Sequence, residues 1–261
     1  MRTALLGLIT AISSVTAFGQ VTLTGTGYTQ NFDSIGSGLP TGWTVSTSAT
    51  PTGLGTSTIF TTDAVSWSST AASGVFRNTS SSNIASGSAS GTQSSNTNRA
   101  LGWRPTLAAE REGSITVEFS NTQGFTNFNL SLSVFTFNNV TAVATYALEY
   151  RVGSSGAFTQ LGDTYTTGTE FSGHTYSITA SSLAALNDQN APLFIRLRGT
   201  TSSGTGSLDG IGIDNFSLTY SAIPEPSAYT LFGGATALVL AGLHRFPRRK
   251  TNPAAKPPVS I

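Results

Sequence analysis

Apolar and polar residues alternate with period two through much of the chain between residues 20 and 221. The segments Ser114–Phe119 and 128–134 place an apolar side chain at every second position, and neither is interrupted by Gly or Pro. This alternation is typical of a strand with one buried and one solvated face. Further strands are predicted at 174–179, 193–198 and 211–220.

The segments between these strands have the composition of turns. Residues 147–152 lead through Gly153-Ser154-Ser155-Gly156 into 157–161, which predicts a hairpin with a Gly/Ser loop. Only residues 182–187 have a helical pattern, and they are long enough for a turn or two. Many short strands joined by Gly, Ser and Thr predict an all-β fold, an antiparallel β-sandwich of the jelly-roll kind that spans residues 20–221.

One segment within this domain, 78–98, departs from the alternation. It is rich in Ser, Asn, Gly and Thr, so it offers little apolar surface to bury. We therefore predict a long low-complexity loop at 78–98. It is either a tolerated insertion or a carrier of O-linked sugar.

Both ends of the chain carry apolar segments. Met1-Arg2, the apolar stretch 4–15 and Ala17-Phe18-Gly19 together predict a signal peptide over 1–19, helical in its apolar part. The apolar run 228–243 would form a helix of about 24 Å, somewhat shorter than the ~30 Å hydrocarbon core of a bilayer. It is predicted to be a transmembrane helix, and the basic residues that follow favour the cytoplasmic side, namely Arg245, Arg248, Arg249 and Lys250.

Pro224-Glu225-Pro226, the apolar run and the basic cluster stand in a characteristic order. Residues 222–250 resemble the PEP-CTERM sorting signal of Gram-negative bacteria, although the tail 251–261 is longer than such signals usually have. The resemblance implies recognition by an exosortase after export by way of signal peptidase. It also implies transient anchoring in the inner membrane and a final place on the cell surface or in the extracellular matrix. A plain C-terminal anchor is the alternative.

The start and end of the domain resemble the first and last strands of bacterial surface jelly rolls, which include carbohydrate-binding modules. The residues that carry this resemblance are Asn31-Phe32-Asp33 with 39–43 near the start and 210–218 at the end. It implies that the segments 21–28 and 213–220 pair in one sheet, and that Asp33 and Asp214 could share a structural Ca²⁺. The alternative is an Asx turn at Asp33 and a strand cap at Asp214.

Alternation within 213–220 predicts which face of this last strand is buried. Phe216 and Leu218 fall on the buried side together with Asp214, which is expected at its edge, whereas Ile213 falls on the opposite side.

Composition and charge exclude several classes of function. The chain has no Cys, which excludes disulfides and thiolate metal sites. Between residues 20 and 221 there are seven Arg and no Lys against eleven acids, a net charge of −4, so nucleic acid is not an expected partner.

The candidate catalytic residues are too few for an enzyme. His174 is the one histidine of the domain and is expected on a strand surface, and no nucleophile elbow or zinc-binding His pair is present. Glu110 and Glu112 are expected in a solvated loop, and Glu118 and Glu149 at outward strand positions. We therefore predict a non-enzymatic protein.

The three tryptophans are the remaining candidates for ligand contact. Trp43 follows a turn and is expected in the core, whereas Trp67 and Trp103 could each stack on a sugar ring or be buried. The sequence favours a structural or display module of the cell surface or extracellular matrix. The alternative is a carbohydrate-binding module of the same fold that contacts extracellular polysaccharide.

Overall fold

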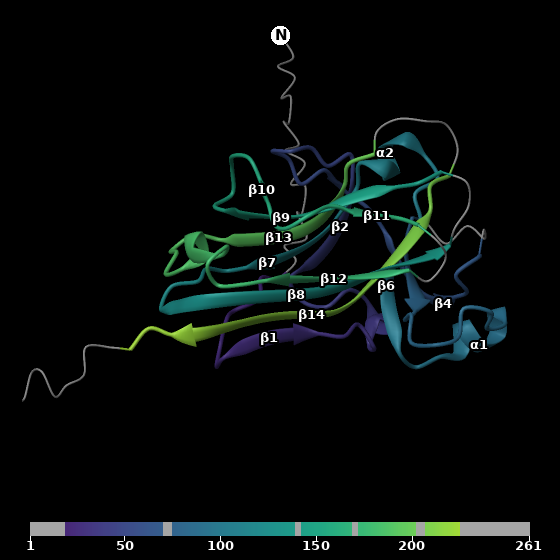
Figure 1. The fold of residues 1–261 in the computed structure, drawn as a ribbon, viewed down its shortest axis with the longest axis horizontal. Coiled ribbons are helices and arrows are strands. Elements are labelled where there is room, and N and C mark those ends of the chain that lie inside the picture. Colours follow the sequence, from purple (N-terminus) through teal and green to yellow (C-terminus); the bar gives the residue numbers. More distant parts are fainter. Residues whose placement is uncertain (1–18, 70–74, 139–141, 169–171, 202–206, 225–261) are drawn as a thin grey trace, which may run out of the picture. The chain divides into compact units, whose positions relative to one another are not determined.

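The computed structural model describes residues 19–69, 75–138, 142–168, 172–201 and 207–224, and this part of the chain is a sandwich of two β-sheets (Figure 1). The all-β prediction is therefore confirmed. The short helical elements are η1 (Ile35–Ser37), α1 (Ser90–Ser95), α2 (Ala108–Arg111) and η2 (Ala184–Leu186). The strands are β1 (Gly27–Gln30), β2 (Trp43–Thr47), β3 (Thr56–Ser57), β4 (Phe60–Val65), β5 (Phe76–Ser80), β6 (Arg99–Trp103), β7 (Ser114–Phe119), β8 (Phe125–Asn138), β9 (Thr145–Val152), β10 (Thr159–Gln160), β11 (Tyr165–Thr166), β12 (Gly173–Ile178), β13 (Leu193–Gly199) and β14 (Gly210–Ala222).

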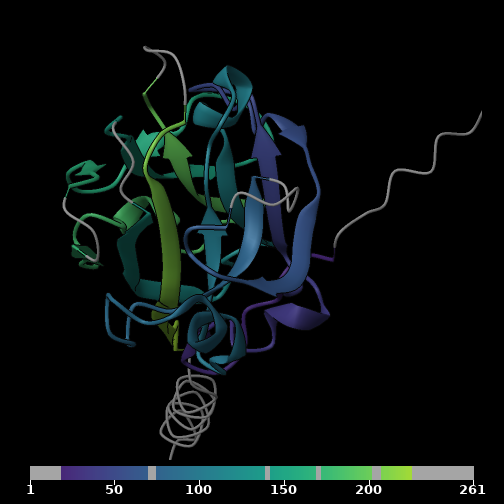
Figure 2. The ribbon, with the colours of Figure 1, turned by 90° about the vertical axis from the view of Figure 1, so that its right-hand side faces the viewer.

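Each sheet combines strands that are distant in the sequence. Sheet 1 has the order β12-β8-β14-β6-β5-β4, and β1 also pairs with β14. Sheet 2 has the order β10-β9-β13-β7-β2-β3, and β11 also pairs with β9. The named pairs are antiparallel except β4 with β5. In the order of sheet 1, β6 separates these two strands from β14, which is green in Figure 2. The predicted hairpin is present as β9 and β10.

The core lies between the sheets and follows the predicted alternation. Ile115, Val117 and Phe119 of β7 are all buried, as period two requires. Trp43 lies at the centre of the core, with its ring centroid 4.9 Å from that of Phe32 and 5.3 Å from that of Phe216. The prediction that Trp43 belongs to the core is confirmed.

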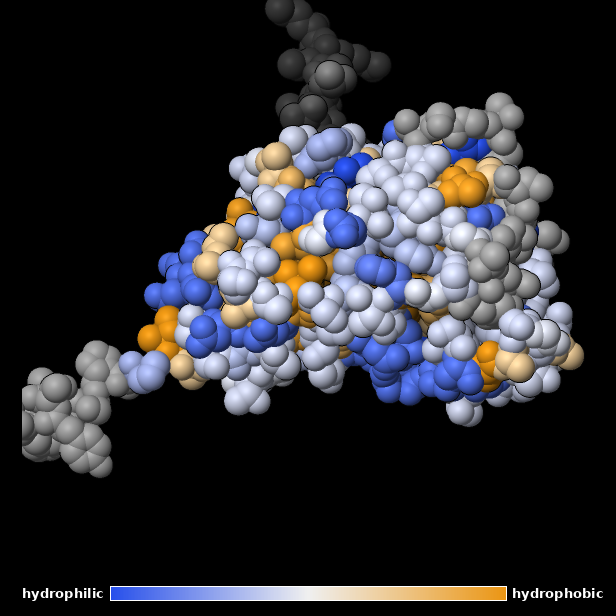
Figure 3. All heavy atoms as spheres, viewed as in Figure 1, coloured by the Kyte–Doolittle hydropathy of each residue, from blue (hydrophilic) through white to orange (hydrophobic). Residues whose placement is uncertain are grey.

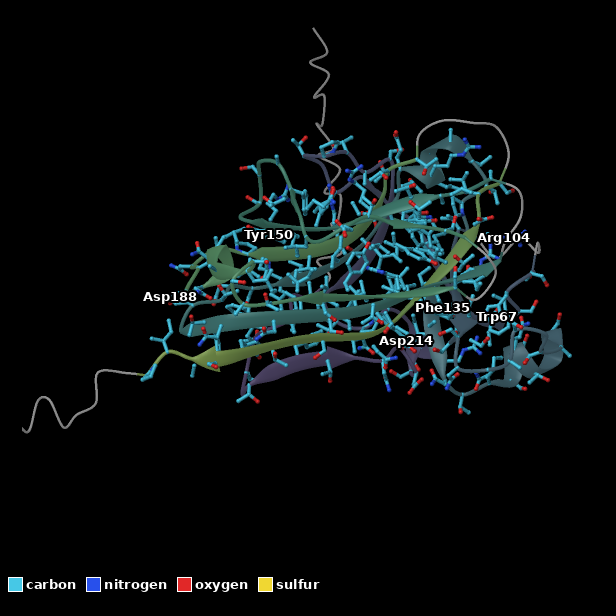
Figure 4. The ribbon with its side chains drawn as sticks, in the orientation of Figure 1. Trp67, Arg104, Phe135, Tyr150, Asp188 and Asp214 are labelled. Carbon is cyan, nitrogen blue, oxygen red and sulfur yellow. The ribbon has the colours of Figure 1, made fainter. Side chains whose placement is uncertain are left out.

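A second, smaller apolar cluster lies on the outer face of sheet 1. It consists of Trp67, Ala100, Phe135 and Phe137, and Figure 4 shows Trp67 and Phe135 close together. Glycine in β14 makes room for it, because a Cβ at Gly212 would lie 2.3 Å from the Phe135 ring. The cluster covers only part of this outer face.

The segment 78–98 is more ordered than its composition predicts. Asn78 to Ser80 belong to β5 and are buried, and Ser90–Ser95 form α1. The reason is a buried arginine: the Arg99 guanidinium donates to the side chain and backbone carbonyl of Asn78 and to the carbonyl of Gln93. Polar partners thus order a segment that has few apolar side chains.

The pairing predicted for the two ends of the domain is confirmed in part. β1 pairs with β14, with Tyr28 opposite Leu218. Val21 does not pair with β14 as predicted, because it forms a parallel bridge with Phe119 of sheet 2. As predicted, Phe216 and Leu218 are buried.

The signal peptide (except Gly19), Glu225, Pro226 and all of 228–261 lie outside the described residues, so the predictions made for them stay predictions. Among the residues that are described, none belongs to a helix long and apolar enough to cross a membrane.

The contact between Gly212 and Phe135 leads to a stability prediction. Gly212→Ala should lower the free energy of unfolding by about 1–3 kcal/mol, because the new Cβ forces the ring and the strand apart. Urea unfolding of the full chain measures this, with Gly87→Ala as the control, since a Cβ at Gly87 meets nothing within 4 Å. Equal stability of the two variants would contradict the packing described here.

Candidate ligand-binding face

The uncovered half of the outer face of sheet 1 carries a row of hydroxyl groups. In register across four strands, Thr29 of β1 lies opposite Ser217 of β14, Ser217 opposite Ser131 of β8, and Ser131 opposite Ser177 of β12. Their inward neighbours along the strands, such as Leu130 and Leu218, are buried, so the four hydroxyl side chains point outward. We call this surface the hydroxyl face.

Two hollows lie on the hydroxyl face and meet at Ser217. One has a volume of about 360 Å³ and the other of about 290 Å³. The first is lined by Thr29, Gln30, Asn31, Asn215, Phe216 and Ser217, and the second by Asn129, Leu130, Ser131, Ser177, Ile178, Thr179, Ser217 and Thr219. None of these residues is charged, and hydroxyl and amide groups line both hollows, although the second hollow exposes more apolar than polar surface. In the view of Figure 3, pale and blue residues cover most of the surface, with groups of orange residues between them.

A bulge in β14 shapes the first hollow. Asp214 pairs with Ser133 and Ser217 with Ser131, so β14 has one residue more than β8 over this interval. Asn215 takes the extra position with a φ of 52°, in the left-handed region that Asn tolerates. The bulge reverses the alternation, which explains why Ile213 and Phe216 are both buried. The prediction that Ile213 lies on the outer side was wrong for this reason.

The bulge coincides with a change of neighbour along β14. Residues 211–213 pair with β6, whereas residues 216–219 pair with β1, on the same side of the strand. Between the end of β1 and the start of β6, Asp33 accepts a hydrogen bond from the backbone N–H of Arg99 at 3.0 Å. We call this junction of β1, β6 and β14 the seam.

Asp214 lies buried at the seam, at the position that Figure 4 labels. Its carboxylate accepts hydrogen bonds from the Ser81 hydroxyl at 2.6 Å and from the N–H of Asn215 at 2.7 Å. Burial raises the pKa of Asp214 above its usual value, the two hydrogen bonds oppose that change, and the negative charge of Asp33 adds to it.

The structure thus brings Asp33 and Asp214 close enough to interact. Each carboxylate has protein donors, since Asp33 also accepts from the Asn31 amide at 2.6 Å. Among the described residues, no group of three or more His, Cys, Asp or Glu is placed to hold a metal ion. The shared Ca²⁺ stays a prediction, and Ser81 is a seam residue that sequence reasoning missed.

The prediction that Trp67 and Trp103 are candidates for sugar contact is not supported by their positions, because both are buried. The Trp67 indole N–H donates to the carbonyl of Ser80 at 3.0 Å, and that of Trp103 to the carbonyl of Glu110 at 3.1 Å. With the ring packed and the N–H satisfied, neither tryptophan presents a face to a ligand.

Glu149 takes the outward strand position that was expected, since its neighbour Leu148 belongs to the core, but it is not solvated. Glu149 is buried, and it pairs with Arg196 at 2.7 Å and with Arg198 at 2.8 Å. Arg111, between Glu110 and Glu112, is buried in α2 and does not lie in a solvated loop. The Glu149 carboxylate is occupied by two guanidinium groups, so it is not free to act as an acid or a base. His174 lies on β12 as expected, 4.5 Å from the Tyr176 ring.

Sequence reasoning overlooked the residues of the hydroxyl face, although a signal was present. Asn129-Leu130-Ser131-Leu132-Ser133 alternates strictly, and its polar side chains are short. Ser217 and Thr219 follow the same pattern in β14. A search for strands with small hydroxyl side chains on one face would have found them.

No family model matches the chain, and no curated protein matches it. Three solved structures are similar to it. A cleaved adhesin domain of Lys-gingipain from Porphyromonas gingivalis W83 has a TM-score of 0.41 and 12% identity, with 77% of this chain and 100% of that chain covered. A xylan-binding domain of family CBM 22 has a TM-score of 0.38 and 13% identity over 76% and 96% of the two chains. The CBM22-1 xylan-binding domain from Paenibacillus barcinonensis has a TM-score of 0.35 and 12% identity over 51% and 78%.

The raised pKa of Asp214 predicts how stability depends on pH. The folded protein binds the proton of Asp214 more tightly than the unfolded chain does. The contribution of Asp214 to stability is therefore full below the unfolded pKa and is lost as the pH rises through the folded pKa. The melting temperature of the wild type minus that of Asp214→Asn should accordingly rise as the pH is lowered from 7 towards 4.

Thermal melts of both proteins across this range provide the measurement. Asp63→Asn, which removes an exposed acid of β4, is the control. A difference between wild type and Asp214→Asn that shrinks on acidification would show that the hydrogen bonds to the carboxylate outweigh its burial.

Proposed function

We propose that this chain is an exported, non-enzymatic surface module that binds an uncharged polysaccharide on its hydroxyl face. The observation that carries the proposal is the row Thr29–Ser217–Ser131–Ser177, which crosses four strands and joins two hollows. Every hydroxyl of a sugar is both donor and acceptor, as are the Ser and Thr hydroxyls, and the Asn and Gln amides offer both groups. An array of such side chains complements a neutral sugar chain without any ionic contact.

The dimensions of the row favour a polymer over a single sugar. Neighbouring strands lie about 4.8 Å apart, so a row across four strands extends for about 14 Å. A polysaccharide that lies along this row would place several successive sugar units in contact with it. Leu130 and Phe216 border the hollows but are buried with their side chains in the core, so direct contact with a ligand falls to the hydroxyl and amide side chains.

A purely structural or display role is the second candidate. It is favoured by the burial of all three tryptophans, because many sugar-binding sites depend on an exposed aromatic ring. On either reading the chain reaches the outside of a Gram-negative cell through its signal peptide and its PEP-CTERM-like tail. Exosortase and signal peptidase are the proposed partners on that route.

Filling the point where the two hollows meet tests the binding function. Ser217→Tyr should weaken binding of a neutral polysaccharide at least about tenfold, because the phenol ring occupies the space of the ligand at a cost of more than ~1.4 kcal/mol. Affinity electrophoresis of the full chain in detergent, through gels that contain xylan, galactan or glucan, measures the dissociation constant. The control is Ser57→Tyr, at an exposed position of sheet 2. Migration of the wild type unchanged by every neutral polymer, or equal retardation of Ser217→Tyr, would refute this function.

The sorting signal leads to a separate prediction. Glu225→Ala should leave the full-length precursor in the membrane fraction of the producing cell, because the charged residue between Pro224 and Pro226 is the proposed recognition element of the exosortase. Mass spectrometry of the mature wild-type protein should show that its C-terminal residues are missing. Native mature protein that still carries Arg248 to Ile261 would exclude processing.

A further inference from the structure

The hydroxyl face is bounded on one side by a strand that has a free edge. β12 pairs with β8 over all six of its residues, in uninterrupted register from Gly173 opposite Phe135 to Ile178 opposite Leu130. Within the described residues, the backbone groups of β12 form no hydrogen bond to any strand other than β8. In an antiparallel pair every second residue directs its N–H and C=O away from its partner. A row of unpaired donors and acceptors therefore borders the face.

Sheet edges of this kind are usually protected, and in the described part of the chain several of the usual protections are missing from β12. Gly173–Ile178 contains no Lys, Arg, Asp, Glu or Pro, has no residue with positive φ, and is free of bulges. The other edges in the described part of the chain are blunted: β3, β10 and β11 have two residues each, β1 has four, and β4 is interrupted by a register shift between Thr61 and Ala64. A long, flat, uncharged edge is a template for pairing with another strand.

We propose that β12 pairs antiparallel with β12 of a second copy of this chain, which makes the hydroxyl face continuous across a symmetric dimer. The Ser172 carbonyl accepts a hydrogen bond from the N–H of Thr136 in β8, so Gly173, Thr175 and Ser177 direct their own N–H and C=O groups to the free edge. Antiparallel pairing centred on Thr175 uses the groups of all three residues. With Thr175 opposite Thr175 of the second copy, Gly173 faces Ser177 and His174 faces Tyr176. Exposed side chains then stand beside exposed ones, and inward side chains beside inward ones.

The symmetry has a consequence for ligand binding. A two-fold axis perpendicular to the sheet leaves the outer faces of both copies on the same side. The hollow that contains Ser177 lies next to β12, so the dimer brings two such hollows together across the interface. A polymer could then contact both copies, whereas a short oligosaccharide would contact only one.

Because the chain has no Cys, a single introduced cysteine reports on the interface. Thr175→Cys should form a disulfide-linked dimer under mild oxidation, because directly opposed residues of a hydrogen-bonded antiparallel pair have Cα atoms about 5.5 Å apart, within the range that a disulfide spans. Thr166→Cys, at an exposed edge position of sheet 2, is the matched control and should remain monomeric on a non-reducing gel. Equal cross-linking of the two variants, or none with Thr175→Cys, would overturn the proposal.

Charge reversal gives an independent readout that does not depend on oxidation. Thr175→Lys should raise the dimer dissociation constant at least about tenfold, because like charges then stand opposite one another across the interface. Mixing Thr175→Lys with Thr175→Glu should restore the dimer. Sedimentation velocity of the full chain in density-matched detergent measures both. A monomeric wild type, or failure of the mixture to associate better than either variant alone, would contradict pairing at this residue.

These experiments separate the dimer from the proposed polysaccharide binding. Thr175 does not line either hollow, so a monomeric Thr175→Lys variant that still binds polysaccharide with reduced affinity would support both proposals. Loss of binding in Ser217→Tyr with an intact dimer would likewise show that the face and the edge act separately. A wild-type dimer that binds no polymer would refute the binding function alone.

Discussion

Strand β14 forms backbone pairs with two different strands along the same side, and the arrangement of the rest of sheet 1 depends on this double pairing. β6 and β1 lie end to end along it, and the chain leaves β1 for the sequence that returns as β6 some seventy residues later. The bulge at Asn215 takes up the misfit between the two pairings. Ser81, Asp33 and Asp214 fill the seam with hydrogen bonds, so a carboxylate is buried where an apolar side chain would leave backbone groups unpaired. The same bulge turns Asn215 outward and forms the wall of the first hollow.

On the outer face of sheet 2, a buried ion pair holds loops against the sheet. Arg196 is buried there: its guanidinium binds Glu149 and donates to the carbonyls of Gly53 and Thr50, and it lies 3.5 Å from the centroid of the Phe158 ring. Burial lowers its pKa to about 10, so it remains charged at neutral pH. Removing either partner would leave an uncompensated buried charge, which is strongly destabilising. The loops around residues 50–53 and 158 are held over sheet 2 in this way, so they cover its outer face around Arg196.

The sequence predicted the strands well because period two depends on local chemistry alone. Ser114–Phe119 was predicted residue for residue, and the pairing of β1 with β14 followed from the resemblance of the end segments. The errors have a common physical cause, which is that polar residues were assumed to be solvated. Asn78 and Glu149 are buried because each has partners distant in sequence, and a sequence does not show such partners. The side on which Ile213 lies was wrong because a bulge arises from the competition of two partner strands, and alternation within one strand carries no sign of it. The alternation of short hydroxyl side chains was visible in the sequence. On a single strand, however, such side chains resemble ordinary exposed residues, and only the register between strands places them in one row.

A face made of small neutral side chains has a particular energetic character. Ser and Thr lose little side-chain entropy on binding, but each hydrogen bond exchanges with water and contributes only about 0.5–1.5 kcal/mol. A single hollow of this kind therefore binds a short sugar weakly. Affinity has to come from the number of contacts along an extended ligand, and a free edge beside the face is the structural means of increasing that number. When two copies present their faces on one side, the second contact with the same polymer becomes intramolecular, and the apparent affinity can exceed that of one face by about 10²–10⁴-fold without any new type of interaction. Neither β12 nor the lining of the two hollows carries an Asp, Glu, Lys or Arg. A charge on β12 would oppose the pairing of two copies, because like charges would meet across the interface. A charge in the hollows would favour a charged ligand over a neutral sugar chain.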